Sequence, residues 1–145
     1  MQVFFDTSVL VAASVGSHPH HAQALTALRR VAHGEDRGFI GVHSIAETYA
    51  ALTRIPVTPR IHPSDAGRII HENILKHFVL VDAGQAEYLQ ALATVQDNGL
   101  PGAKIYDALL LACAASSGAE RIYTFNLGDF RNLAPADLLA RICSP

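Results

Sequence analysis

The sequence predicts an α/β protein in which helices cover a mostly parallel sheet. Short apolar segments of strand length alternate along the chain with longer segments that have helical spacing of apolar residues. Half of the 145 residues are apolar and 17% are charged, which is a composition that supports a large buried core. No repeat, low-complexity tract or linker divides the chain, so we expect one domain over residues 1–145.

The first part of the chain is expected to hold two strands and three helices. Residues 2–5 (QVFF) favour a short buried strand, and Asp6, Thr7 and Ser8 are all residue types that begin helices, so a helix should follow through SVLVAAS. The next expected elements are a helix over 20–33 with Ala22, Leu25, Leu28 and Ala32 at helical spacing, a strand over 37–42, and a helix over 43–55 with Ile45, Tyr49 and Leu52 on one face.

The second part begins with an irregular connection, because PVTPRIHPS contains three prolines. Ser64 is expected to cap the next helix. YDALLLACAASS is apolar nearly all round, which indicates a buried central helix. The other expected elements are a helix over 65–76, a strand over 78–82, a helix over 85–97 that buries Ala86, Leu89, Leu92 and Ala93, a strand over 121–125 and a short helix in the tail LAPADLLARI.

Oxygen-bearing side chains follow several of these strands. Asp6 ends the first strand, Glu47 lies in the first turns of the helix after the second, and Asp107 lies in the first turn of the buried helix. Asn126 and Asp129 come just after the strand over 121–125. Because ligands bind at the carboxyl ends of parallel strands, we expect these residues to share one edge of the sheet.

This set of side chains suits a hard divalent cation. Mg²⁺ and Mn²⁺ prefer oxygen ligands, whereas several carboxylates without a cation repel one another. A bound cation polarises a phosphate and lowers the pKa of a water, as phosphodiester hydrolysis requires. Each residue also has a simpler interpretation: Asp6 as a helix cap, Glu47 as a solvated helix residue, Asp107 as a carboxylate bound to backbone N–H groups, and Asp129 as a turn residue.

Three motifs in this order resemble those of PIN-domain ribonucleases of the VapC toxin type: VFFDTSVLVAA, SIAETYAAL and IYDALLLACAASSGAERIYTFNLGDF. The resemblance covers nearly the whole chain. It implies a three-layer α/β/α sandwich and a Mg²⁺- or Mn²⁺-dependent endoribonuclease. It also implies a homodimer, an RNA substrate and a cognate antitoxin protein that silences the enzyme.

The resemblance also assigns roles to individual residues. Asp6, Asp107 and Glu47 become metal ligands, with Asp129 as a further candidate for metal binding and catalysis. Asn126 stands where the family usually has a fourth acidic residue, and this departure leaves open whether one or two cations bind. Thr7, Ser8 and Thr124 are expected to donate hydrogen bonds to the carboxylates. Lys104, three residues before Asp107, is a candidate contact for an RNA phosphate.

Charge, cysteine content and hydropathy set further bounds. The net charge of −2 gives no support to binding dominated by phosphate contacts. Two separate cysteines form no disulfide framework, which suits a cytoplasmic protein, and no apolar run is long enough to span a membrane. The HPHH stretch at 18–21 matches no catalytic zinc pattern and is expected to be a solvated loop.

Two alternatives to a nuclease remain open from the sequence. A PIN-like domain could bind RNA or protein without cleaving it, and Asn126 favours this interpretation. An aspartate-based phosphatase would use Asp6 as a nucleophile. That chemistry usually places a second Asp two residues later, where this chain has Ser8.

Overall fold

The computed structural model describes all residues from 1 to 145, and its centre is a five-stranded sheet. The strands are β1 (Gln2–Phe5), β2 (Arg37–Gly41), β3 (Phe78–Val81), β4 (Arg121–Tyr123) and β5 (Ile142–Cys143). Their order across the sheet is β3-β2-β1-β4-β5, and every neighbouring pair is parallel. The predicted parallel α/β architecture is therefore confirmed.

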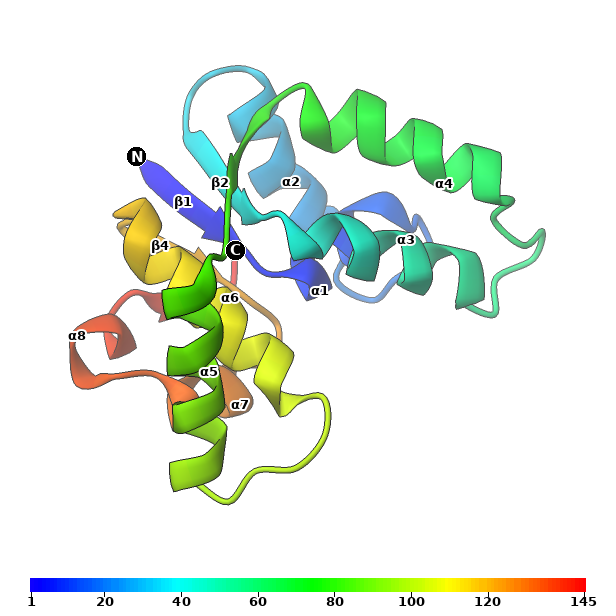
Figure 1. The fold of residues 1–145 in the computed structure, drawn as a ribbon. Coiled ribbons are helices and arrows are strands. Elements are labelled where there is room, and N and C mark those ends of the chain that lie inside the picture. The colour runs from blue at the N-terminus through cyan, green and yellow to red at the C-terminus, as the bar shows by residue number, and fades with distance from the viewer.

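Helices connect each strand to the next. They are α1 (Thr7–Ser14), α2 (His21–Ala32), α3 (His43–Arg54), α4 (Pro63–Ile69), the π-helix η1 (Ile70–Leu75), α5 (Gln85–Asp97), α6 (Lys104–Ser117), α7 (Leu127–Leu133) and α8 (Ala136–Leu139). The first five cover one face of the sheet and the last four cover the other (Figure 1). This is the three-layer α/β/α sandwich that the motifs imply.

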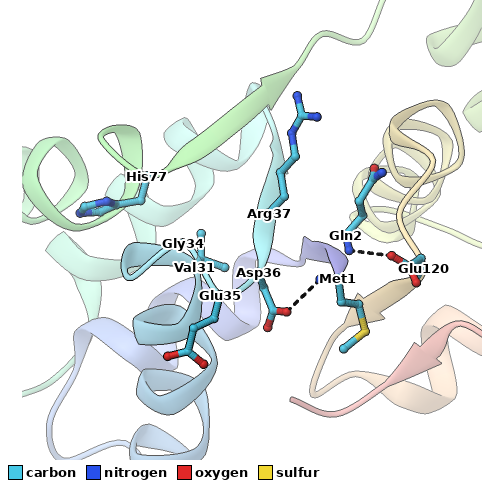
Figure 2. Close-up of a pocket in the computed structure, with 9 residues that line it drawn as sticks. All are labelled: Met1, Gln2, Val31, Gly34, Glu35, Asp36, Arg37, His77 and Glu120. Carbon is cyan, nitrogen blue, oxygen red and sulfur yellow. Dashed lines mark hydrogen bonds and ion pairs between the residues drawn. The ribbon is translucent and has the colours of Figure 1, made fainter.

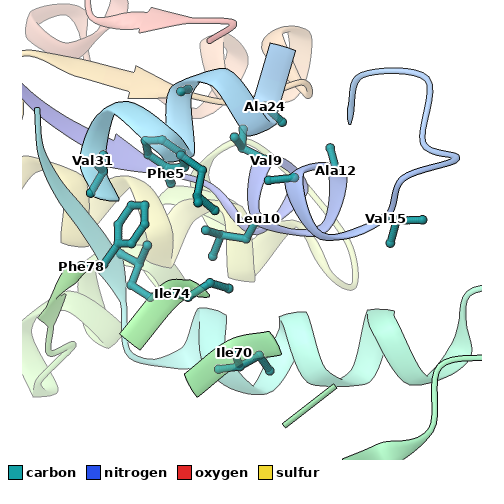
Figure 3. Close-up of a cluster of buried hydrophobic side chains, with 14 of the residues drawn as sticks. Phe5, Val9, Leu10, Ala12, Val15, Ala24, Val31, Ile70, Ile74 and Phe78 are labelled. Carbon is teal, nitrogen blue, oxygen red and sulfur yellow. The ribbon is translucent and has the colours of Figure 1, made fainter. Parts of the chain in front are cut away.

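The alternation of side chains along β1 builds both halves of the core. Val3 and Phe5 point into the cluster under α1, α2 and η1, whereas Phe4 points into the cluster under α6. Figure 3 shows the first cluster, in which Phe5 meets Phe78 edge to face at 4.9 Å between ring centroids. Because β1 is covered on both faces, Val3, Phe4 and Phe5 are apolar without interruption up to Asp6.

Gly38 in β2 is required by close packing. A Cβ atom at this position would lie 2.6 Å from the Phe78 ring and from Val31, so any other residue would push α2 or β3 away from the sheet.

The extents of the expected helices are close to those observed, but several predicted faces and one cap are wrong. Helix α5 buries Ala91 and Val95, and it leaves Leu89 57% and Leu92 50% exposed. Small residues let α5 approach α6 closely, so the larger side chains of the predicted face turn outward. Along α5 the wrongly assigned residues are Ala86, Leu89, Leu92 and Ala93.

Helices α2 and α3 are each rotated relative to the expected face. Ala22 is exposed and the core side of α2 is formed by Ala24, Ala27, Leu28 and Val31. In α3, Tyr49 is exposed and Ser44 and Thr48 are buried beside Leu52. Apolarity alone did not find the buried stripe of α3 because two of its three members are polar.

The start of α4 and the chain after β4 also differ from expectation. His62 rather than Ser64 is the N-cap of α4: its Nδ1 accepts a hydrogen bond from the Ser64 amide at 3.2 Å. The short helix α7 and the strand β5 were not predicted. Both are short elements, and β5 gains its hydrogen bonds only from its neighbour β4. No helix is long and apolar enough to cross a membrane.

Candidate active site

A cavity of about 630 Å³ opens at the carboxyl edge of the sheet. Its walls come from Asp6 after β1, from α1, from the connection between α1 and α2, from α3, from α6 and from the loop after β4. The lining residues are Asp6, Thr7, Ser8, Val11, His18, Pro19, His20, Glu47, Ala51, Asp107, Phe125 and Asn126. The structure thus brings Asp6, Glu47, Asp107 and Asn126 to one place.

Asp6 lies at the junction of β1 and α1 and is only 2% exposed. Its backbone occupies the N-cap position of α1, yet its side chain makes no capping hydrogen bond. Instead its Oδ2 accepts hydrogen bonds from Ser8 Oγ at 2.5 Å and from Thr124 Oγ1 at 2.8 Å. Burial raises the pKa of Asp6, and the two hydroxyls oppose this shift. The side chain of Asp6 is therefore directed mainly at the hydroxyls of Ser8 and Thr124 rather than at the start of its own helix.

The hydroxyls that hold Asp6 also fix the loop after β4. Ser8 Oγ accepts a hydrogen bond from the Phe125 amide at 3.2 Å, and Thr124 Oγ1 accepts one from the Asn126 amide at 2.9 Å. Neither Thr7 nor Ser8 caps α1 with its side chain, contrary to expectation, because both hydroxyls are directed at carboxylates. The position of Asn126 at the cavity is thus tied to Asp6.

Glu47 is positioned by residues of α1 and α3. Thr7 Oγ1 lies 3.3 Å from Glu47 Oε1 and 3.2 Å from Ser44 Oγ. His43, one turn before Glu47, places its Nε2 3.2 Å from the same Oε1, although the angle is not that of a hydrogen bond. His43 was not predicted as a site residue, although its i,i+4 spacing to Glu47 was a signal in the sequence.

Asp107 lies in the first turn of α6 and is half-buried. Burial is the main cause that raises its pKa to about 6, and the negative charge of Asp6 adds to the shift. Lys104 opposes it, whereas Asp129 and Glu47 reinforce it. Asp107 therefore experiences the field of the other carboxylates even though no hydrogen bond joins them.

Lys104 and Asp129 lie beside the cavity rather than in its lining. Lys104 Nζ at the start of α6 forms an ion pair with Asp129 Oδ2 in the first turn of α7. In this structure the carboxylate of Asp129 is directed at Lys104, away from the group formed by Asp6, Glu47 and Asp107.

The histidine-rich loop is not merely a solvated loop. His20 is exposed, as expected, but its ring stacks on Phe125, with 4.3 Å between centroids and 13° between planes. His18 lies 5.8 Å from His20 between ring centroids. Both histidines line the acidic cavity. Sequence spacing gave no sign of this, because His20 and Phe125 are far apart along the chain.

The donor set fits a hard divalent cation. Asp6, Glu47 and Asp107 offer only oxygen atoms, and none of the three pairs with a lysine or arginine. The pKa values of Asp6 and Asp107 are raised, so bringing a positive charge near them relieves an electrostatic cost. As the side chains stand, no three of them already converge as a ligand group. The assignment of a divalent cation to this site therefore rests on the chemistry of the three carboxylates and not on a preformed ligand geometry.

The fold and the cavity together define a class of protein: a parallel α/β/α domain with an acidic site at the carboxyl ends of its strands. The PIN domain family model matches residues 3–135, so the chain belongs to the PIN domain family.

Two relatives from Mycobacterium tuberculosis are similar over most of the chain. The protein named Ribonuclease VapC27 is 33% identical over 115 residues, which cover 79% of this chain and 78% of that protein. Ribonuclease VapC40 is 31% identical over 115 residues, which cover 79% of this chain and 80% of the relative.

Two solved structures share the fold. The crystal structure of Mycobacterium tuberculosis VapC20, described as a sarcin-ricin loop cleaving toxin, has a TM-score of 0.69 at 20% identity and covers 88% of this chain and 92% of its own. VapBC2 from Rickettsia felis, bound to a DNA fragment from its promoter, has a TM-score of 0.65 at 18% identity, covering 92% and 96%.

Proposed function

We propose that this chain is a metal-dependent endoribonuclease that forms one PIN-like nuclease domain over residues 1–145 and acts as the toxin of a toxin–antitoxin pair. The observation that carries the proposal is the buried Asp6, held by two hydroxyls in a cavity with Glu47 and Asp107 and without a cationic side chain. The relatives named as ribonucleases support RNA as the substrate.

We assign the metal to Asp6, Asp107 and Glu47. Mg²⁺ or Mn²⁺ at these carboxylates would stabilise the negative charge on the phosphoryl oxygens and favour ionisation of the attacking water. Ser8 and Thr124 fix the Asp6 carboxylate, and Thr7 orients that of Glu47, which also lies close to His43.

The residues around these carboxylates have auxiliary roles in the proposal. Asn126 contributes a neutral oxygen or amide group at the cavity wall. Asp129 acts through its ion pair with Lys104, whose ammonium group would otherwise be free to approach Asp107. Lys104 would contact an RNA phosphate at the rim once substrate displaces Asp129.

The proposal is tested by incubating the purified protein with a mixed RNA ladder in Mg²⁺, Mn²⁺ or EDTA. We expect internal cleavage that EDTA abolishes. In Asp6→Asn and Asp107→Asn the rate should fall about 100-fold or more, by analogy with the loss of one charge-stabilising group. Asp97→Asn, at an exposed position on α5 outside the cavity, is the matched control and should keep its rate.

Other outcomes of this assay identify the alternatives. RNA binding without cleavage in any metal would contradict the nuclease proposal and favour a silent PIN-like binding domain, which Asn126 in the cavity would suit. The phosphatase alternative has less support, because Ser8 donates a hydrogen bond to Asp6 at the position where that chemistry needs a second carboxyl group.

We propose that the antitoxin binds an apolar groove between α3 and the α4–η1 segment. This groove has a volume of about 530 Å³ and includes Val42, Ile45, Tyr49, Ile70 and Leu75. An amphipathic helix binds such a groove with its apolar face. The structural likeness to a VapBC assembly agrees with this partner. Tyr49→Lys should prevent co-purification with the cognate antitoxin, while Tyr106→Lys, an exposed tyrosine outside the groove, should not.

We further propose a homodimer in the cytoplasm. Exposed Tyr88, Leu89 and Leu92 form an apolar surface on α5 that a second copy would cover. Light scattering after size exclusion should give the mass of two chains for the natural sequence and of one for Leu89→Lys. A monomer at high micromolar concentration would contradict the dimer.

A further inference from the structure

An aromatic wall stands on one side of the acidic cavity. It consists of His18, His20 and Phe125, and all three residues line the same cavity as Asp6 and Asp107. His20 is exposed, while His18 and Phe125 are half-buried. The wall therefore lines the cavity with ring surface, and Phe125 also packs against the core cluster that contains Phe5 and Leu10.

Hydrogen bonds fix the histidine side of this wall. The His20 amide donates to His18 Nδ1 at 3.1 Å, and the His18 amide donates to the Val15 carbonyl at 2.9 Å. The next residue, His21, has its Nδ1 2.9 Å from the carbonyl oxygen of Ala12. The loop is thus tied to the C-terminal end of α1 at Ala12 and Val15, which limits the ordering cost of binding a ligand.

The Phe125 side is tied directly to the acidic group. Its amide donates to Ser8 Oγ, and Ser8 Oγ donates to Asp6 Oδ2. Because His20 stacks on Phe125, the histidine loop is also held at a fixed position relative to Asp6. A flat group that contacts the wall would be held at a set position relative to Asp6.

The chemistry of the cavity indicates which flat group this is. No lysine or arginine lines it, and its carboxylates repel phosphates, so the cavity itself offers little direct attraction for an RNA backbone. Aromatic and histidine rings, by contrast, stack on unpaired bases of RNA, and each stacked base contributes affinity irrespective of its sequence. A base inside a duplex is already stacked on its neighbours and is not available.

We propose that His18, His20 and Phe125 form a base-stacking subsite that holds one unpaired nucleobase of the RNA next to the bond to be cleaved. The inference rests on the proposed function and adds to it a substrate element: an unpaired nucleotide, in a single strand or loop. The subsite selects flipped or unpaired bases, and it positions the neighbouring phosphate at Asp6, Glu47 and Asp107.

Binding can be measured separately from cleavage. We would titrate the Asp107→Asn variant in Mg²⁺ with a short single-stranded RNA that carries one 2-aminopurine, a base whose fluorescence is quenched by stacking. Quenching is expected when His18, His20 and Phe125 are unchanged, which we call the parent wall. Adding His20→Ala should weaken binding about 5- to 150-fold, which is the range for loss of one base stack. Adding His20→Phe should keep the affinity within about threefold, because stacking requires a ring and not an imidazole.

The matched control is His33→Ala, an exposed histidine at the end of α2 that lies outside the cavity. It should leave both quenching and affinity unchanged. An RNA with an abasic nucleotide in place of 2-aminopurine should bind the parent wall as weakly as the intact RNA binds His20→Ala, and a fully paired duplex should show no added quenching.

The subsite is overturned if His20→Ala binds like the control, if the abasic RNA binds as tightly as the intact one, or if His20→Phe is as weak as His20→Ala. The last two outcomes would point to an imidazole contact with phosphate. Quenching without any metal-dependent cleavage by the natural sequence would refute the nuclease function and leave the subsite standing. Cleavage without quenching would refute the subsite alone.

Discussion

The two ends of the sheet each bury an aspartate, and the two side chains have opposite surroundings. At the amino ends of the strands Asp36 is 6% exposed, and its carboxylate lies 2.7 Å from Arg30 Nε. It also pairs with the N-terminal ammonium of Met1 at 3.2 Å, and this second contact is drawn in Figure 2. These partners lower its pKa. At the carboxyl ends Asp6 is 2% exposed, accepts hydrogen bonds from the hydroxyls of Ser8 and Thr124, shares its cavity with Glu47 and Asp107, and has a raised pKa.

The difference separates a structural carboxylate from a functional one. Asp36 has its countercharges in the chain and needs nothing further to be stable when ionised. Asp6, Glu47 and Asp107 concentrate negative charge without a lysine or arginine partner, which costs stability and suits a cation supplied from outside. Solvent exposure alone would not have distinguished Asp6 from Asp36, because both residues are buried.

The largest expected effect is on cleavage. Asp6→Asn should reduce metal-dependent RNA cleavage about 100-fold or more, because the carboxylate that the hydroxyls of Ser8 and Thr124 position is lost. Asp36→Asn should stay within about threefold of the parent rate per folded molecule, since Asp36 lies at the opposite end of the strands. Equal losses in the two variants, measured at matched folded concentration, would remove the functional distinction.

The next effect is on stability. Asp36→Ala should lower the free energy of unfolding at pH 7 by about 2–3 kcal/mol, because it breaks charge-assisted hydrogen bonds to Arg30 and Met1. The pKa of Asp36 is lowered on folding, so this contribution is present above the ordinary pKa of an aspartate and is lost as pH falls through the folded value. Urea unfolding of the parent and the variant at pH 7 and below pH 3 measures the size of this loss and its dependence on pH. A loss of the same size in acid would contradict the ionic origin.

A smaller effect is expected on metal affinity. Thr7→Val removes the hydroxyl that contacts Glu47 and keeps the shape of the side chain. We expect about tenfold weaker Mn²⁺ binding by calorimetry, as for other groups that orient a ligand. Thr7→Ser restores the hydroxyl and is the matched control. If valine and serine variants bind Mn²⁺ alike, Glu47 is not held for the metal by this contact.

The smallest effect concerns Asp107 in EDTA. Folding raises its pKa to about 6, so the folded state holds this proton more tightly than the unfolded state and ionisation above pH 6 costs stability. Asp107→Asn should therefore raise the free energy of unfolding at pH 8 by on the order of 1 kcal/mol after allowance for solvent screening. The gain should vanish at pH 4, and urea unfolding at both values tests the sign. A destabilised variant at pH 8 would show that the carboxylate is structural.

Much of this protein followed from sequence, because its signals are local. Alternation of short apolar segments with helical segments indicated four of the five strands. Strand β1 ends at Phe5, just before the three cap-forming residues that begin with Asp6. The positions of Glu47 and Asp107 near helix starts followed in the same way, and the edge rule for parallel sheets then placed them with Asp6.

The tertiary structure decided what periodicity leaves open: which stripe of a helix faces inward, and which distant residues meet. The inward stripe of α5 is Ala91 and Val95, because close contact with α6 selects small residues over Leu89 and Leu92. Asp129 pairs with Lys104, and His20 stacks on Phe125, through contacts that no local pattern encodes. Sequence by itself determined where the carboxylates stand along the chain. Only packing brought Thr124 to Asp6, which lies 118 positions away along the chain. Packing also placed Arg30 and the N-terminal ammonium beside Asp36, whereas no such cation lies beside Asp6.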